Sequence, residues 1–232
     1  MGQKVNPIGI RLKINQFWKS NWYAQADYGK FLVEDIKVRN YITRKVFREK
    51  NYSGLEMSDI RIKRFPNVLD LTIFVTRPGV LIGKRGSDLE ELKAQLRKKF
   101  NIKSQIYIGI NEIKKVDLDA QAVAQTVGKM IKGRRPYKRS AKQAISRAMT
   151  AGARGIKVRV AGRLGGSEMA RQEFFKEGSV PLHTFDSLLD YGHYDALTTY
   201  GIIGVSVWIC KGKESKSQFK NTDFRGLVRS KQ

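Results

Sequence analysis

Cysteine and histidine are nearly absent from this sequence of 232 residues, which holds one Cys, Cys210, and two His. A single cysteine excludes a disulfide framework within the chain and a zinc site built on several cysteines. Two histidines also argue against a metal site made mainly of imidazole ligands. Cys210 lies in an apolar segment, so we expect it to be buried and unreactive. We therefore predict neither a metal site nor a cofactor.

Long hydrophobic runs are also missing. No stretch approaches the roughly 20 apolar residues that a membrane-spanning helix needs, and the opening residues, MGQKVNPIGIRL, hold no apolar core of a signal peptide. The start Met1-Gly2 matches the beginning of an N-myristoylation motif, but Asn6 stands where that motif requires Ser or Thr. These absences predict a cytosolic chain without a membrane partner.

Acidic residues are scarce relative to basic ones. The chain has 21 Asp and Glu against 45 Lys and Arg, which gives a formal net charge of +24. Self-repulsion of this size destabilises a compact state unless a polyanion neutralises it, which argues against an ordinary metabolic enzyme. With 41% hydrophobic and 10% aromatic residues the chain can still bury a core, so it is not a disordered basic tail.

The scarcity of acids is greatest from Ala120 to Ser167, a segment with no Asp or Glu and twelve Lys or Arg. A face that meets only solvent typically mixes both signs, because interspersed acids lower self-repulsion. We therefore infer that this segment builds a surface that contacts phosphate.

Residues 17–112 are predicted to form a first domain, preceded by residues 1–16 as an extended basic arm without sustained periodicity. Apolar spacing of helical and alternating type marks its elements. The expected order is a helix over residues 28–50, a two-stranded hairpin over 60–65 and 69–76, a glycine loop over 83–86, a helix over 88–100 and a strand over 106–110. Ser87 or Asp88 is expected to cap the second helix.

The glycine loop Gly83-Lys84-Arg85-Gly86 carries the first functional signal. Glycines let the backbone approach a sugar–phosphate chain, Lys84 and Arg85 add charge, and the following helix start stabilises an anion. A GXXG loop between helices and a sheet clamps about four nucleotides in the KH module. The P-loop pattern does not fit, because only three residues separate Gly79 from Gly83. The alternative is that the glycines serve only the turn into the helix.

Residues 113–212 are predicted to form a second domain, a mostly antiparallel sheet backed by two helices, and residues 213–232 a basic flexible tail. On the second helix, Lys138, Arg139 and Lys142 fall within about 100° of one another. The opposite side is rich in alanine, which is too small to anchor in lipid and so favours a nucleic-acid backbone as the partner.

Signals of catalysis are weak. We find no paired carboxylates in an apolar setting and no nucleophile elbow, and we expect His183 and His193 to be structural. We therefore predict no enzyme. Two alternatives stay open at this point: a lyase that forms a Schiff base through a lysine amine, and a free-standing KH protein.

Four long segments carry a resemblance: MGQKVNPIGIRL, RPGVLIGKRGSDLEEL, GARGIKVRVAGRLGGSEMARQEFFKEGSVPLHT and TTYGIIGVSVWICKG. They closely resemble the family of the bacterial-type small-subunit ribosomal protein three, over nearly the whole chain up to about Lys213. The resemblance implies an α+β fold, in which a type II KH domain precedes a two-layer α/β domain with a mostly antiparallel sheet and two helices. It also implies a place in the head of the small ribosomal subunit, in the cytoplasm.

The same resemblance implies the partners: 16S-type rRNA, mRNA and neighbouring head proteins, with no small-molecule substrate. Proteins of this family lie at the mRNA entrance, where basic side chains on one helix grip incoming mRNA and help to open its secondary structure. That role falls here on Lys138, Arg139 and Lys142. We expect further rRNA contacts from Lys4, Arg11, Arg134, Arg135, Arg154, Lys157, Arg159 and Arg163.

Overall fold

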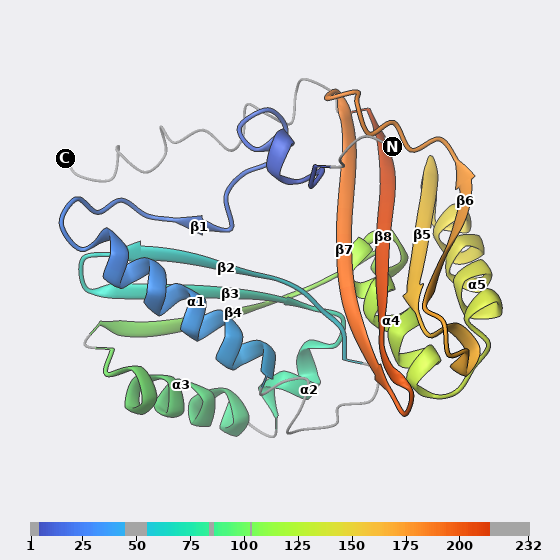
Figure 1. The fold of residues 1–232 in the computed structure, drawn as a ribbon. Coiled ribbons are helices and arrows are strands. Elements are labelled where there is room, and N and C mark those ends of the chain that lie inside the picture. The colour runs from blue at the N-terminus through green and yellow to red at the C-terminus, as the bar shows by residue number, and fades with distance from the viewer. Residues whose placement is uncertain (1–4, 45–54, 84–85, 103, 214–232) are drawn as a thin grey trace. The chain divides into compact units, whose positions relative to one another are not determined.

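A computed structural model of the chain describes residues 5–44, 55–83, 86–102 and 104–213. The chain divides into two compact units. One is Trp18–Val116, called here the first unit. The other, called the second unit, combines Asp117 onward with the described residues up to Phe17. Figure 1 shows the elements of both units.

The first unit packs two helices against a four-stranded sheet of order β1-β2-β3-β4. The central pair β2–β3 is antiparallel, and the outer pairs β1–β2 and β3–β4 are parallel. Helices α1 and α3 share one apolar core with the sheet (Figure 1). The bounds are β1 Ser20–Asn21, α1 Tyr28–Arg44, β2 Met57–Phe65, β3 Val68–Val75, α2 Pro78–Ile82, α3 Ser87–Phe100 and β4 Gln105–Glu112.

Alternation explains how this sheet buries one face. Along β3 every second residue is buried, among them Leu69, Leu71 and Ile73, because side chains of a strand point alternately to its two faces. Val38 and Ile42 of α1 join the same core at helical spacing. The expected hairpin and flanking helices are therefore present. The part of the predicted first helix beyond Arg44, residues 45–50, lies outside the described residues.

One local prediction in the first unit is wrong, and one short helix was missed. Neither Ser87 nor Asp88 caps α3: the cap is Gly86, in the left-handed region at φ 83°, and it makes no side-chain capping bond. The five-residue helix α2, which begins at Pro78, was not expected, because one turn is too short to show periodicity. Proline suits that first position, since its missing N–H would be unpaired there.

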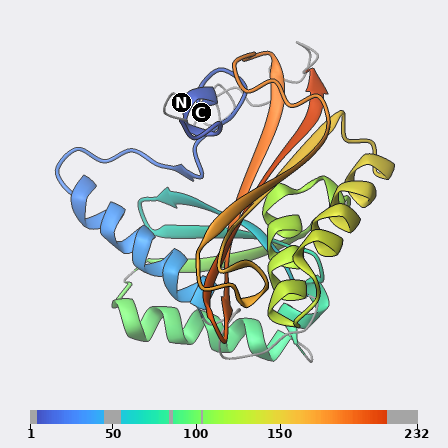
Figure 2. The same cartoon turned by 45° about the vertical axis from the view of Figure 1, so that its right-hand side comes forward.

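The second unit stacks α4 and α5 on one face of an antiparallel sheet of order β6-β5-β8-β7, as Figure 2 shows. Ile156, Val158 and Val160 of β5 alternate into the core beneath the helices. This arrangement confirms the predicted fold class. The bounds are α4 Ala120–Lys132, α5 Tyr137–Thr150, β5 Gly155–Gly162, β6 Arg171–Gly178, β7 Ser187–Thr198 and β8 Gly201–Lys213.

Residues 5–17 differ from the extended arm that we expected, because they pack into the second unit. A short 3-10 helix, Gly9–Arg11, turns the chain so that Arg11 becomes fully buried. Asn15 Nδ2 donates to the Phe185 carbonyl at 2.8 Å, and Gln16 Nε2 donates to that of Leu189 at 2.8 Å. The segment therefore belongs to the second unit and supplies hydrogen bonds to a loop and to strand β7, both distant in sequence.

Candidate nucleic-acid interface

Helix α5 carries the strongest candidate surface. Its side chains Ala141, Ala144 and Ala148 are buried, and the small alanines let the helix lie close to the sheet. Lys138, Arg139 and Lys142 are all exposed, on the side that helical geometry predicts. We call these three residues the basic face.

The members of the basic face differ in their surroundings. Lys138 Nζ lies 3.9 Å from the carboxylate of Glu173 on β6, and the Tyr137 hydroxyl donates to that carboxylate at 2.8 Å. No acidic group in the described part of the chain pairs with Arg139 or Lys142. The charges of Arg139 and Lys142 are therefore the ones available to an external anion. The contact with Glu173 comes from another strand, so the helix pattern alone could not predict it.

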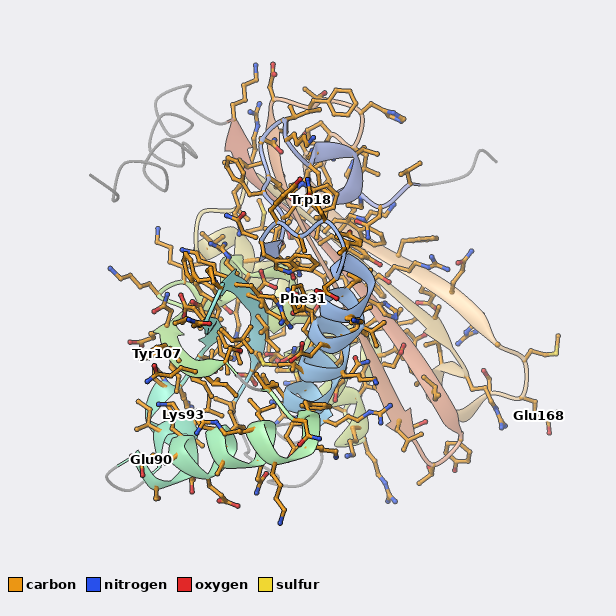
Figure 3. The ribbon with its side chains drawn as sticks, turned by 90° about the vertical axis from the view of Figure 1, so that its left-hand side faces the viewer. Trp18, Phe31, Glu90, Lys93, Tyr107 and Glu168 are labelled. Atoms are coloured by element: carbon orange, nitrogen blue, oxygen red, sulfur yellow. The ribbon has the colours of Figure 1, made fainter. Side chains whose placement is uncertain are left out.

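The surroundings of α5 are basic as well. Arg134 and Arg135 are exposed in the turn between the two helices, and α4 ends in Lys129 and Lys132. The first acid after the acid-free segment is Glu168, which is exposed in the loop between β5 and β6 (Figure 3). A surface with this excess of cations attracts a phosphate backbone by releasing its counterions.

The remaining predicted rRNA contacts fall into two groups. Arg154 is exposed, whereas Lys157, Arg159 and Arg163 are half-buried. Arg163 is engaged within its own domain, because Nε donates to the Ser167 carbonyl at 2.9 Å. Lys157 and Arg159 lie on the strand face that points away from the helices, since the alternate residues of β5 are core.

Arg11 does not occupy the position that we predicted for an rRNA contact. Its guanidinium is buried and donates to five backbone carbonyls, at 2.9–3.4 Å. Burial lowers the pKa of Arg11. A side chain whose donors are directed to these carbonyls has a structural role. The sequence shows only its charge, because four of its five partners lie at least 170 positions later in the chain. The five carbonyls belong to Pro7, Pro181, Leu182, Thr184 and Ser187.

Only the two glycines of the GXXG loop are described, because Lys84 and Arg85, like Lys4, lie outside the described residues. Gly83 and Gly86 both have positive φ, 73° and 83°. At Gly83 a Cβ would stand 2.6 Å from Cγ of Asp88, so no larger residue fits there without a shift. The glycines are thus required by the turn itself, which is compatible with a backbone-binding loop and with the purely structural alternative.

Two groups that could suggest chemistry, the His193 imidazole and the Cys210 thiol, have structural surroundings. His193 places Nδ1 3.0 Å from the Ser206 hydroxyl and Nε2 3.0 Å from the Asp195 carboxylate, on an open sheet face. Cys210 is buried, as predicted. Within residues 5–44, 55–83, 86–102 and 104–213, no three His, Cys, Asp or Glu gather as a metal site would require. Over the same residues, no helix has the length and apolar character to span a membrane.

Comparison with family models matches both halves of the chain. The model described as "KH domain" matches residues 37–118, and the one described as "Ribosomal protein S3, C-terminal domain" matches residues 127–209.

Curated relatives match along nearly the whole length. The "Small ribosomal subunit protein uS3" of Vesicomyosocius okutanii is 47% identical over 232 residues, which cover 98% of this chain and 97% of the relative. That of Geobacter metallireducens is 46% identical, covering 92% and 97%. That of Listeria monocytogenes is 43% identical, covering 96% and 99%.

Proposed function

Because this chain belongs to the family of the small ribosomal subunit protein uS3, we propose that it grips incoming mRNA at the entrance of the small subunit and helps to unwind it. The membership itself makes the chain a structural, RNA-binding component of the ribosome in the cytoplasm and not an enzyme. It associates there with rRNA and other ribosomal proteins. The near full-length match to ribosomal relatives favours this role over the lyase and the free-standing KH alternatives.

The basic face of α5 is the observation that carries the proposal. Lys138, Arg139 and Lys142 project from a helix that rests rigidly on a sheet, and two of the three lack an acidic partner among the described residues. Cations at fixed spacing bind successive phosphates of a single strand. A strand held in this way opposes the reannealing of a hairpin ahead of it, because its phosphates are already engaged.

The rest of the basic surface is proposed to hold the protein on rRNA. We assign this role to Arg134, Arg135, Arg154, Lys157 and Arg159 of the predicted domain 113–212. The GXXG loop of the predicted domain 17–112 adds an independent backbone contact through Gly83 and Gly86. Phosphate contacts of this kind set position and orientation without reading base sequence.

Affinity for rRNA should therefore depend steeply on salt. With several phosphates neutralised, we expect the binding constant to fall by about a thousandfold between about 50 and 200 mM monovalent salt. Filter binding of the full chain to a fragment of small-subunit rRNA at several salt concentrations measures this slope. A flat dependence would contradict a phosphate-dominated interface.

The mRNA role is tested by the double substitution Arg139→Ala with Lys142→Ala. We expect subunits carrying it to assemble normally and to translate unstructured mRNA at the usual rate, but to pass a stable hairpin several-fold more slowly. The physical reason is the loss of two phosphate contacts, each of which contributes to holding the opened strand. Single-ribosome translocation through hairpins of graded stability provides the measurement.

Arg147→Ala is the matched control, since Arg147 is an exposed arginine of the same helix that lies about two turns beyond Arg139 and about 140° around from Lys142. It removes a charge of the same sign without touching the basic face. Equal slowing by the control and the double variant, or passage of the hairpin at the normal rate by the double variant, would contradict the proposed mRNA role.

A further inference from the structure

The sheet of the second unit has a face that points away from α4 and α5. Strand register aligns two rows of side chains across β6, β5, β8 and β7 on this face. They lie opposite the helices because the neighbouring positions, such as Ile156 and Val158, are in the core. The first row is Lys176, Lys157, Trp208 and Tyr191, and the second is Phe174, Arg159, Ser206 and His193.

Three aromatic rings and two cations of these rows touch one another. Lys157 Nζ lies 4.9 Å from the centre of the Phe174 ring and 5.5 Å from that of Trp208. Tyr191 and Trp208 have ring centres 5.3 Å apart. The guanidinium of Arg159 lies 6.0 Å from the Phe174 ring. We call these five side chains the aromatic surface; it continues across all four strands.

The aromatic surface is partly exposed and carries two positively charged side chains. Phe174 is 47% exposed, so part of its ring remains accessible. Neither row contains Asp or Glu, and Asp195 in the adjoining row is hydrogen-bonded to His193. Arg159 Nε is buried and has no hydrogen-bond partner among the described residues.

We propose that the aromatic surface binds unpaired nucleotides of RNA, with bases stacked on Phe174 and on the Trp208–Tyr191 pair and with phosphates contacting Lys157 and Arg159. The inference rests on the proposed function and refines it by naming single-stranded RNA as the ligand of this face. Exposed rings stack on bases of any sequence, and interleaved cations follow the backbone. A duplex cannot use the rings in this way, because its bases are already stacked.

The substitution Phe174→Leu removes a stacking ring and leaves every charge in place. With the full chain and a decanucleotide of uridine as probe, we expect binding to weaken about tenfold. The slope of affinity against salt should stay unchanged. Phe65→Leu is the matched control, because Phe65 is a 45% exposed phenylalanine of the other unit, on β2. Equal affinities of the two variants would overturn the inference.

A second variant keeps the test valid if Phe174→Leu alters folding. Lys157→Gln with Arg159→Gln retains the aromatic rings and the core of β5. It should lower the salt slope for the same probe by about the equivalent of two phosphate contacts. An unchanged slope would count against the aromatic surface, and so would equal binding of the wild-type chain to uridine decanucleotide and to a hairpin of matched length.

Ultraviolet cross-linking in assembled subunits separates this inference from the function beneath it. We expect peptides of β6 or β8 that contain Phe174 or Trp208 to carry an attached nucleotide. If those peptides are joined only to another ribosomal protein, the RNA inference is wrong while the ribosomal role stands. If the wild-type chain fails to bind any RNA or to enter subunits, the proposed function itself is wrong.

Discussion

Replacing Arg11 by alanine should destabilise the second unit by at least about 3 kcal/mol, although this residue lies near the start of the chain. Five carbonyls lose the Arg11 donor: four lie in residues 181–187, a segment with few other backbone hydrogen bonds, and the fifth is that of Pro7. Hydrogen bonds to a charged donor are stronger than neutral ones, and a buried acceptor left unpaired carries its full desolvation cost.

The single thiol of the chain reports on this region. Cys210 is fully buried and pairs in register with Leu189, whose carbonyl accepts the amide of Gln16. We expect Arg11→Ala to speed labelling of Cys210 by a thiol reagent by about a hundredfold or more in the isolated protein, as the opening free energy falls. The urea midpoint of the second unit should fall with it.

Two further substitutions make this test specific. Arg11→Lys keeps the charge but offers one ammonium group with three donors, so it should recover only part of the lost stability. Lys13→Asn removes an exposed cation two residues away, at a position with φ of 66° that asparagine tolerates, and should leave labelling unchanged. Labelling of Arg11→Ala at the wild-type rate would show that the buried guanidinium does not hold the segment.

The contrast between Arg11 and the basic face shows which features the sequence can predict. Lys138, Arg139 and Lys142 are brought together by the 100° step of a single helix, so their common exposure follows from spacing alone. The burial of Arg11 depends on carbonyls of a loop that is distant in sequence, and no local pattern contains that information. The same charge therefore has opposite roles at the two positions.

The aromatic surface shows an intermediate case. Alternation within β5 predicts that Lys157 and Arg159 share a face. Their neighbours Phe174 and Trp208 become visible only once the strand order β6-β5-β8-β7 and its register are known. Most element types were thus predictable from local periodicity and the type II KH fold from the family resemblance, whereas contacts across strands required the structure.

The substitution Asp35→Ala should destabilise the first unit by about 3–5 kcal/mol. Asp35 is buried on α1, and its carboxylate accepts from the Trp22 indole at 2.8 Å, from the Ser20 hydroxyl at 3.0 Å and from two nitrogens of Arg64. It joins the helix to strand β2 and to the chain around β1. Removing it leaves the guanidinium of Arg64 buried beside the Phe31 ring of α1 (Figure 3) without its main counter-charge.

Further variants separate the charge pair from ordinary packing. Glu34→Ala removes a second, more exposed carboxylate that binds the same Arg64 at 3.0 Å, and should cost less than about 1 kcal/mol. Asp35→Leu with Arg64→Met removes both charges together and should cost clearly less than Asp35→Ala, because no unpaired charge stays buried. Hydrogen exchange of peptides from α1 and β2 gives the local unfolding free energy for each variant. With Asp35→Leu and Arg64→Met also made singly, the central result is non-additivity: a double variant as unstable as the sum of these two single changes would mean that the pair is not coupled.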